Sequence, residues 1–209
     1  MTAAVVVAHP DDETLWAGGT ILAHREWEWF IVTLCRAHDQ DRAPKFFRAL
    51  KRLGATGRMA DLDDEPEQTP LVHQQVEETV LSLLDRKSLD VILTHGPQGE
   101  YTRHLRHEEV SKAVAALWQT GRVRAHSLRM FAYEDGGKRY LPRAVEGAHL
   151  RTALSDELWQ DKYRIITEIY GFGAESFEAR TTPREEAFWC FDSPQAYRDW
   201  MEEERGRWR

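Results

Sequence analysis

Cysteine is scarce in this sequence, and long apolar runs are missing from it. Cys35 and Cys190 are the only cysteines among 209 residues, too few for a disulfide framework, which favours a reducing compartment. No stretch approaches the roughly 20 apolar residues that cross a bilayer. A strand-like apolar run begins so close to Met1 that it leaves no room for a secretory signal. We therefore expect a cytoplasmic protein without membrane insertion.

An excess of basic residues is also missing. The formal net charge is −7, whereas proteins that bind nucleic acid or anionic membranes nonspecifically present basic faces. The hydrophobic content of 42% and the charged content of 30% are ordinary for a globular chain. A chain of this length can build one α/β domain with a substantial core. We therefore expect a single domain over residues 1–209 that binds no nucleic acid.

Apolar runs and helical spacings alternate along most of the chain. Short runs rich in β-branched residues predict strands, and apolar residues every three or four positions predict helices. The expected strands cover Ala3–Ala8, Trp29–Leu34, Arg58–Leu62, Leu89–Thr94, Leu128–Tyr133, Val145–Leu150 and Ala187–Phe191. The expected helices cover Asp11–Arg25, Ala43–Leu53, Leu71–Leu84, His104–Trp118, Ser155–Tyr170 and a terminal segment from Ser193. This order predicts an α/β fold, a Rossmann-like three-layer sandwich with a mostly parallel sheet and helices on both faces.

A cluster of polar residues follows the first expected strand. The apolar run from Val5 stops at His9, and Asp11, Asp12 and Glu13 open the next helix. Open α/β sheets bind their ligands at this end of their strands. Adjacent carboxylates repel each other, and partial burial adds a desolvation penalty that a divalent cation would offset. The alternative is that the acids only complement the helix dipole while His9 caps a turn.

Further polar groups follow two other expected strands. After Leu89–Thr94 comes the turn-rich loop His95–Thr102, and then His104 and His107 share one face of a helix. They are candidate metal ligands or surface polar residues. After the second strand, Arg42 ends a polar loop that right-handed connections place beside the first strand. Arg42 is a candidate to contact the site or its substrate, and a solvated loop cation is the alternative.

The acidic segment Asp61–Pro70 contains two prolines and reads as a surface loop. We expect its acids to face solvent rather than to form a second metal site. Gly18 and Gly19 lie inside an expected helix, where glycine is unfavourable by roughly 1 kcal/mol. Their use would be a close approach of that helix to the sheet.

Four short segments occur in an order known from one protein family. They are Ala8-His9-Pro10-Asp11-Asp12-Glu13, Gly18-Gly19, Gly99-Glu100-Tyr101 and His104-Leu105-Arg106-His107. In these segments the chain resembles the PIG-L/LmbE-like zinc-dependent N-acetylglucosaminyl deacetylases. The resemblance implies a hydrolase that removes the N-acetyl group of an N-acetylglucosamine-type sugar or conjugate. It also implies Zn²⁺ as the cofactor and a small acetylated amino-sugar as the substrate.

The resemblance also implies roles for individual residues. His9, Asp12 and His107 would hold the zinc ion, which lowers the pKa of its water and polarises the amide carbonyl. Asp11 would be the general base, kept ionised by the cation. His104 would stabilise the oxyanion as an imidazolium and then protonate the leaving amine.

Two positions depart from the family pattern. The family commonly has an aspartate directly before the ligand histidine, where this chain has Arg106, so Glu108 or Glu109 is a candidate to orient His104 instead. The Gly-Glu-Tyr segment lies one residue further from the histidines than is usual, which leaves Tyr101 a candidate substrate-side group.

The substrate side of the site is less defined. Trp16 is a candidate platform for stacking a sugar at the pocket mouth, and packing of its own helix is the alternative. We expect the chain from Tyr170 onward to shape the substrate pocket, by analogy with the fold. Whether the protein forms a homo-oligomer stays open.

Two rival functions remain. A magnesium-dependent phosphotransferase would use the acids at the strand end, but magnesium prefers oxygen ligands, which leaves His9 and His107 without a purpose. A noncatalytic sugar- or metal-binding module on the same fold would keep the ligands and could dispense with the base. The presence of Asp11 favours an enzyme.

Overall fold

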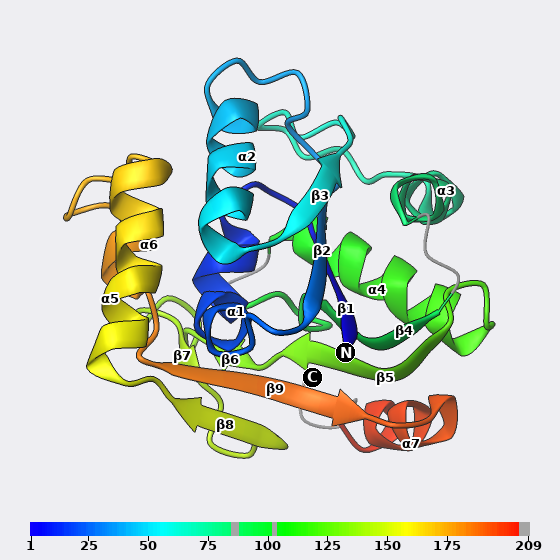
Figure 1. Cartoon of the computed structure of the whole chain (residues 1–209). Coiled ribbons are helices and arrows are strands. Elements are labelled where there is room, and N and C mark those ends of the chain that lie inside the picture. The colour runs from blue at the N-terminus through cyan, green and yellow to red at the C-terminus, as the bar shows by residue number, and fades with distance from the viewer. Residues whose placement is uncertain (85–87, 102–103, 205–209) are drawn as a thin grey trace.

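A seven-stranded sheet organises the chain (Figure 1). The computed structural model describes residues 1–84, 88–101 and 104–204, so Thr102 of the predicted loop lies outside the described residues. The strand order is β3-β2-β1-β4-β5-β9-β8. The strands are β1 (Thr2–Val7), β2 (Glu28–Thr33), β3 (Thr56–Met59), β4 (Leu89–Thr94), β5 (Ala125–Phe131), β8 (Leu150–Ala153) and β9 (Glu185–Phe191). The first five pair in parallel, and β9 runs antiparallel to both of its neighbours.

Helices cover both faces of the sheet. They are α1 (Asp12–Ala23), α2 (Arg42–Leu53), α3 (His73–Leu83), α4 (Leu105–Gln119), α5 (Asp156–Arg164), the π-helix η1 (Ile165–Ile169), α6 (Phe177–Thr181) and α7 (Pro194–Glu204). Alternate residues of β1 face opposite layers. Val6 joins the core under α3, α4 and α7, while Val5 joins the core under α1, α2 and η1. The predicted three-layer α/β fold with a mostly parallel sheet is confirmed.

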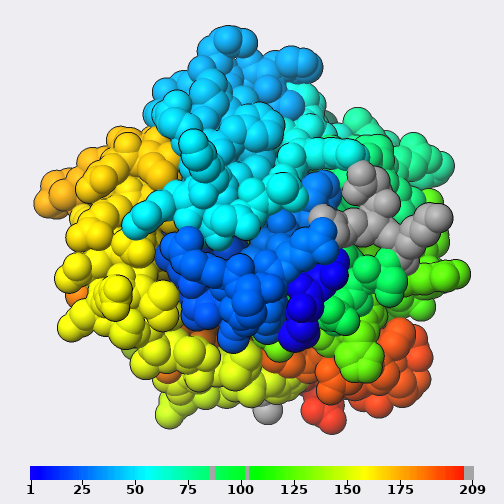
Figure 2. Space-filling view, in the orientation of Figure 1, coloured from blue at the N-terminus to red at the C-terminus, as the bar shows by residue number. Residues whose placement is uncertain are grey.

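The layer that contains α1 also receives the later part of the chain. In the space-filling view, the yellow surface of α5 lies directly against the blue and cyan surfaces of α1 and α2 (Figure 2). Ser155 caps α5 as predicted, since its side chain accepts a hydrogen bond from the Leu158 amide. The predicted helix to Tyr170 is interrupted, because residues from Ile165 form a π-helical turn.

Some predicted boundaries were wrong. The outer strand expected at Val145–Leu150 lies at Leu150–Ala153 instead, where its residues pair with β9. The third strand begins at Thr56 and ends at Met59, two to three residues before the predicted bounds. A small hairpin of β6 (Tyr133–Glu134) and β7 (Arg143–Ala144) was not predicted. Short strands carry too little periodicity to be placed by pattern alone.

The two helical glycines of α1 sit at a close contact. A Cβ atom on Gly19 would lie 2.4 Å from the Leu154 side chain. The amide of Gly19 donates to Oε1 of Glu186, a residue of β9, at 2.7 Å. The predicted close approach of this helix to the sheet is therefore confirmed at Gly19. No helix in the described part of the chain is long and apolar enough to cross a membrane.

Candidate active site

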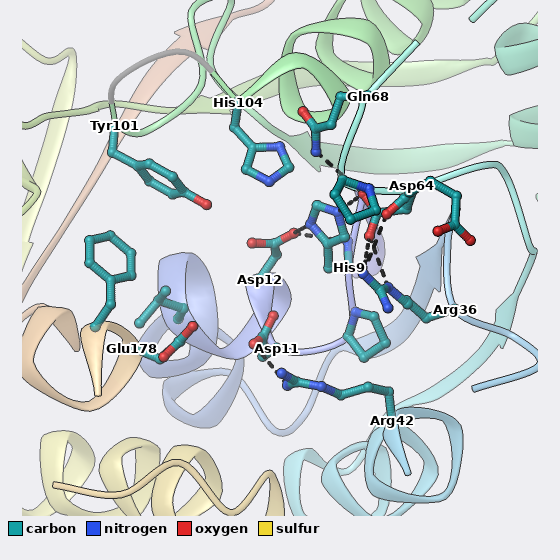
Figure 3. A pocket seen from close by; sticks show the side chains of 15 residues that line it. His9, Asp11, Asp12, Arg36, Arg42, Asp64, Gln68, Tyr101, His104 and Glu178 are labelled. Carbon is teal, nitrogen blue, oxygen red and sulfur yellow. Dashed lines mark hydrogen bonds and ion pairs between the residues drawn. The ribbon is translucent and has the colours of Figure 1, made fainter. Parts of the chain in front are cut away.

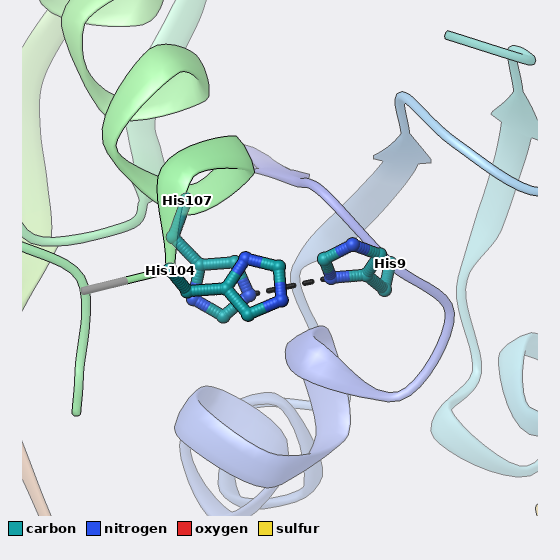
Figure 4. A group of neighbouring side chains, drawn as sticks. All are labelled: His9, His104 and His107. Atoms are coloured by element: carbon teal, nitrogen blue, oxygen red, sulfur yellow. Dashed lines mark hydrogen bonds between the residues drawn. The ribbon is translucent and has the colours of Figure 1, made fainter. Parts of the chain in front are cut away.

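Two loops distant in sequence meet at the carboxyl end of the central strands. His9 follows β1, and His104 and His107 lie at the start of α4, which follows the neighbouring strand β4 (Figure 4). Nδ1 of His9 and Nε2 of His107 are 3.3 Å apart although 98 residues separate them. This convergence is the condition on which a shared metal site depends.

The predicted ligand atoms form a compact triangle. Oδ2 of Asp12 lies 3.1 Å from Nδ1 of His9 and 3.4 Å from Nε2 of His107. Tetrahedral zinc with bonds of about 2.0–2.1 Å keeps its ligand atoms about 3.3–3.4 Å apart. Nitrogen and carboxylate oxygen are also the donor types that zinc accepts. The residues present therefore fit a zinc ion.

Each of these three side chains also makes a hydrogen bond through the atom that faces away from the triangle. Nδ1 of His107 bonds to Glu100 at 2.7 Å, and Nε2 of His9 bonds to Asp64 at 3.1 Å. The second oxygen of Asp12 accepts the indole N–H of Trp16 at 3.3 Å. Partners of this kind fix the orientation of metal ligands and tune their basicity.

Glu100 joins two histidines beneath the site. Its Oε2 also accepts from Nδ1 of His95 at 2.9 Å, and its Oε1 accepts the amide of Gly96. Nε2 of His95 accepts the Ala8 amide at 2.9 Å, so its lone pair is already used, and we assign His95 a structural role. Burial raises the pKa of Glu100, but His95 and His107 outweigh it and bring that pKa to about 2. The Gly-Glu-Tyr segment drew attention to Glu100 in the sequence, but the sequence could not predict that Glu100 binds His95 and His107.

Asp64 corrects the expectation for the acidic loop. Instead of facing solvent, its side chain is only 8% exposed, and it binds both His9 and Arg36. Arg36 donates to it at 2.8 Å and 2.6 Å. Burial raises the pKa of Asp64, but His9 and Arg36 lower it to about 2. Loop composition indicates solvent exposure on average and does not identify the single acid that turns inward.

Arg106 holds the same loop in place. Its guanidinium is 1% exposed and donates to the backbone carbonyls of Asp63 and Thr69 and to Glu109. Within the described residues, Glu109 therefore binds Arg106 and the Leu71 amide instead of His104. Arg106 therefore fastens this loop across the site.

Asp11 lies beside the triangle in a strained conformation. Its φ is 114° and its ψ is −31°, a region that L-residues rarely adopt. Burial, followed by repulsion from Asp12, raises the pKa of Asp11 well above its usual range, and the Arg42 guanidinium 3.4 Å away opposes this. Burial and the neighbouring acids therefore favour the protonated form of Asp11, and added positive charge would favour its ionised form.

Opposite pKa shifts act on Asp12 and His107, two of the predicted ligands. Burial alone would raise the pKa of Asp12 and lower that of His107, but their mutual attraction outweighs burial. The pKa of Asp12 is well below its usual range, and that of His107 is raised to about 10. A metal ion at this position must therefore displace a proton from His107.

His104 differs from the expectation of an imidazolium. Burial and the neighbouring charges of His107 and His9 lower the pKa of His104 to about 3, so the ring is neutral near pH 7. Its Nδ1 has no hydrogen-bond partner within the described ranges, an exception typical of functional sites. A neutral ring can still donate one N–H. His104 also offers an alternative all-histidine ligand set with His9 and His107, whose donor atoms lie within 4.8 Å.

A cavity of about 570 Å³ opens over this cluster (Figure 3). Its lining includes the predicted residues His9, Asp11, Asp12, Arg42, Tyr101 and His104. Phe177 and Glu178 also line the cavity, and the Phe177 ring lies 5.0 Å from that of Tyr101. The chain beyond Tyr170 therefore helps to shape the pocket as expected, although no sequence pattern singled out these two residues. Trp16 is 0% exposed and does not line the cavity. The prediction that Trp16 stacks against a sugar at the pocket mouth is therefore wrong. Trp16 packs in the core, as the alternative interpretation had it.

The comparison with protein families agrees with this geometry. The sequence model of the PIG-L family, described as GlcNAc-PI de-N-acetylase, matches residues 4–118. The chain belongs to the PIG-L family. This membership supports a deacetylase, and hence a hydrolase, activity. No curated protein matches the chain.

Solved structures share the PIG-L-like fold of this chain. The zinc-inhibited form of the teicoplanin deacetylase Orf2 has a TM-score of 0.64 at 15% identity, covering 92% of this chain and 99% of that one. The hydratase GalB from Pseudomonas putida KT2440, which acts on 4-carboxy-2-hydroxymuconate, has a TM-score of 0.56 at 18% identity, covering 91% and 96%. The conserved protein TT1542 from Thermus thermophilus has a TM-score of 0.60 at 17% identity, covering 89% and 92%. At these identities the likeness shows the fold alone.

Proposed function

We propose that this PIG-L family member is a zinc-dependent N-deacetylase of an N-acetylglucosamine-type sugar or conjugate. The observation that carries the proposal is the triangle of His9 Nδ1, Asp12 Oδ2 and His107 Nε2 beside the carboxylate of Asp11. All but one of these four side chains line the cavity, and His107 lies beneath it.

The chain's own residues supply the proton transfers. Bound zinc would polarise the acyl carbonyl and lower the pKa of a coordinated water toward about 7. Asp11 takes a proton from the attacking water as the new C–O bond forms, and the neutral His104 donates an N–H to the oxyanion. The C–N bond then breaks, and the proton passes from Asp11 to the departing nitrogen. The products are acetic acid and the free amine, and near pH 7 the acid's remaining proton moves to the amine to give acetate and an ammonium group.

In this scheme Asp11, rather than His104 as expected from the sequence, protonates the leaving amine. A ring with a pKa of about 3 is almost never in the imidazolium form near pH 7, and the neutral ring is too weak an acid to transfer its remaining proton to the amine. Asp11 gains a proton in the first step, and its buried position favours the protonated form. Arg42, at 3.4 Å from Oδ2, is placed to orient that carboxyl group.

The substrate wall combines rings and polar groups. The rings of Tyr101 and Phe177 pack edge to face at 5.0 Å and line the cavity together with Leu15. Such a wall suits the apolar face of a sugar ring. Arg42 and Gln68 offer donors for hydroxyl groups elsewhere in the lining.

We also propose that residues 1–209 form one domain, since strands from residue 2 to residue 191 join one sheet.

A screen of N-acetylated glucosamine derivatives for acetate release tests the proposal. Protein loaded with one equivalent of zinc should release acetate from at least one of them, and His107→Ala should lose both zinc and turnover. The same screen with excess zinc tests whether the ion also inhibits this protein. Zinc binding without acetate release from any derivative would favour the noncatalytic binding module and overturn the deacetylase.

A further inference from the structure

The backbone of Asp11 is held by the side chain of Glu13. Glu13 is 0% exposed, and its Oε2 accepts the Asp11 amide at 3.0 Å. Asp11 is the residue whose backbone φ is 114°. A conformation this rare persists only where the surroundings over-determine it. The Glu13 carboxylate is therefore part of what keeps Asp11 in its unusual geometry.

Glu13 is held in turn by Tyr170. The Tyr170 hydroxyl donates to Glu13 Oε1 at 2.6 Å, across 157 positions of sequence, and Thr14 donates to the same oxygen at 2.7 Å. Tyr170 is 1% exposed and does not line the cavity. It follows the π-helical turn, and its amide bonds to the Ile165 carbonyl at 3.0 Å. The contact joins the end of η1 to the loop that carries the candidate base.

We propose that Tyr170 is a positioning residue that acts through Glu13 to aim the Asp11 carboxylate into the cavity. The inference rests on the proposed function, in which Asp11 is the base. Tyr170 lies beyond residues 4–118, the part that matches the family. A residue of this chain's later half thus sets the geometry of its first loop.

Tyr170→Phe removes the hydroxyl and keeps the ring. We expect kcat to fall on the order of ten- to hundredfold, because a small misplacement of a reacting group has effects of that size. KM and zinc content should stay near those of the unmodified protein. The substrate is the glucosamine derivative that releases acetate fastest in the screen above.

Tyr133→Phe is the matched control. The Tyr133 hydroxyl is also buried and also bonds to α1, since it donates to the Trp16 carbonyl at 3.0 Å, but it does not reach Glu13. Both variants should lower Tm to a similar extent, whereas only Tyr170→Phe should lower kcat strongly. Equal kcat values for the two variants at equal loss of Tm would overturn the inference.

Two further measurements separate this inference from the proposed function. Amide exchange of Asp11, followed by NMR in the zinc-loaded protein without substrate, should accelerate in Tyr170→Phe and not in Tyr133→Phe. In an Asp11→Asn background, Tyr170→Phe should reduce the residual turnover no further. Unchanged exchange, or the same fold-reduction in that background, refutes the positioning role alone. Full activity of Asp11→Asn itself refutes the proposed function.

Discussion

Asp11 combines backbone strain with a buried carboxyl group. A non-glycine residue at positive φ costs of order 1–3 kcal/mol, and this one also faces the Asp12 carboxylate. Both penalties fall on the residue that we propose as the base. Functional residues commonly carry such strain, because the surrounding fold compensates for it.

Asp11→Asn should therefore separate stability from activity. Asparagine tolerates positive φ and removes the repulsion from Asp12. We expect zinc to stay bound, Tm to stay level or rise, and turnover to fall by about 10²–10⁴-fold. Zinc analysis, thermal melting and the acetate assay measure the three effects, with the exposed Asp41→Asn as the control. Retained turnover would contradict the base assignment.

His107 makes metal binding depend on pH. Its pKa in the metal-free fold is raised to about 10, so a proton occupies the ligand nitrogen near neutrality. Zinc must displace that proton, and its apparent affinity should rise by about tenfold per pH unit between pH 7 and pH 9. Competition with a chelator at several pH values measures the slope. An affinity that does not change over this range would contradict the assignment.

The stability of the metal-free fold should fall as pH rises, whereas the zinc affinity should increase. Because the folded pKa of His107 is raised, its protonated ring stabilises the fold fully below the unfolded value of 6.5. This contribution declines as pH rises toward about 10. Metal-free protein should therefore melt at lower temperature at pH 9 than at pH 6.5, and the difference should shrink in His107→Ala. Thermal melting across this range checks the sign.

Among the elements, the loop from Asp61 to Pro70 has the clearest effect on the site. Arg106 ties it to α4 through the Thr69 and Asp63 carbonyls, and Asp64 then reaches His9. The loop thus connects the start of α4 with His9, the candidate ligand that follows β1. Arg106 therefore has a structural use in this chain.

Asp64→Ala tests that connection. Removing an orienting partner of a metal ligand typically lowers affinity by about 10–100-fold, and we expect a loss of that size for zinc. Asp61→Ala is the control from the same loop, because Asp61 pairs with the exposed His38 and not with a ligand. Equal zinc affinities in the two variants would show that Asp64 does not position His9.

At the scale of the whole molecule, the later half of the chain supports α1. Glu186 of β9 accepts the amides of Gly19 and Thr20 at 2.7 Å and pairs with Lys162 of α5, also at 2.7 Å. Lys162 and Glu186 are both 0% exposed. Burial lowers the pKa of Lys162, and Glu186 opposes this. One ion pair therefore connects α5, β9 and the middle of the helix that carries Asp12.

Lys162→Met should destabilise the fold strongly. It leaves the Glu186 carboxylate buried without its cation, and such losses are about 3–5 kcal/mol. The double variant Lys162→Met, Glu186→Gln should regain part of this, because the uncompensated charge is gone. Urea unfolding measures both, with Lys138→Met, on the hairpin turn, as the control. A single variant as stable as the control would contradict the buried pair.

The sequence alone determined the layered fold and the edge of the sheet where the candidate site lies. Strand periodicity, the order of strands and helices and the rule that ligands gather at strand ends are local or topological, so these polar residues could be placed at one edge of the sheet without coordinates. The choice of His9, Asp12 and His107 as zinc ligands came from the resemblance to the PIG-L family and stays a prediction. The sequence also indicated Asp11 and Arg42 beside them.

Tertiary structure decided which partners orient those ligands and which groups carry protons. Several contacts join positions that no local pattern relates. They are the inward turn of Asp64 to His9, the two hydrogen bonds of Glu100 to histidines, the burial of Trp16 and the hydrogen bond from Tyr170 to Glu13. The neutral state of His104 follows from burial and from charges on other segments. Hydrogen bonds and pKa shifts depend on distances of a few ångströms between distant residues, and only the packed fold sets those distances.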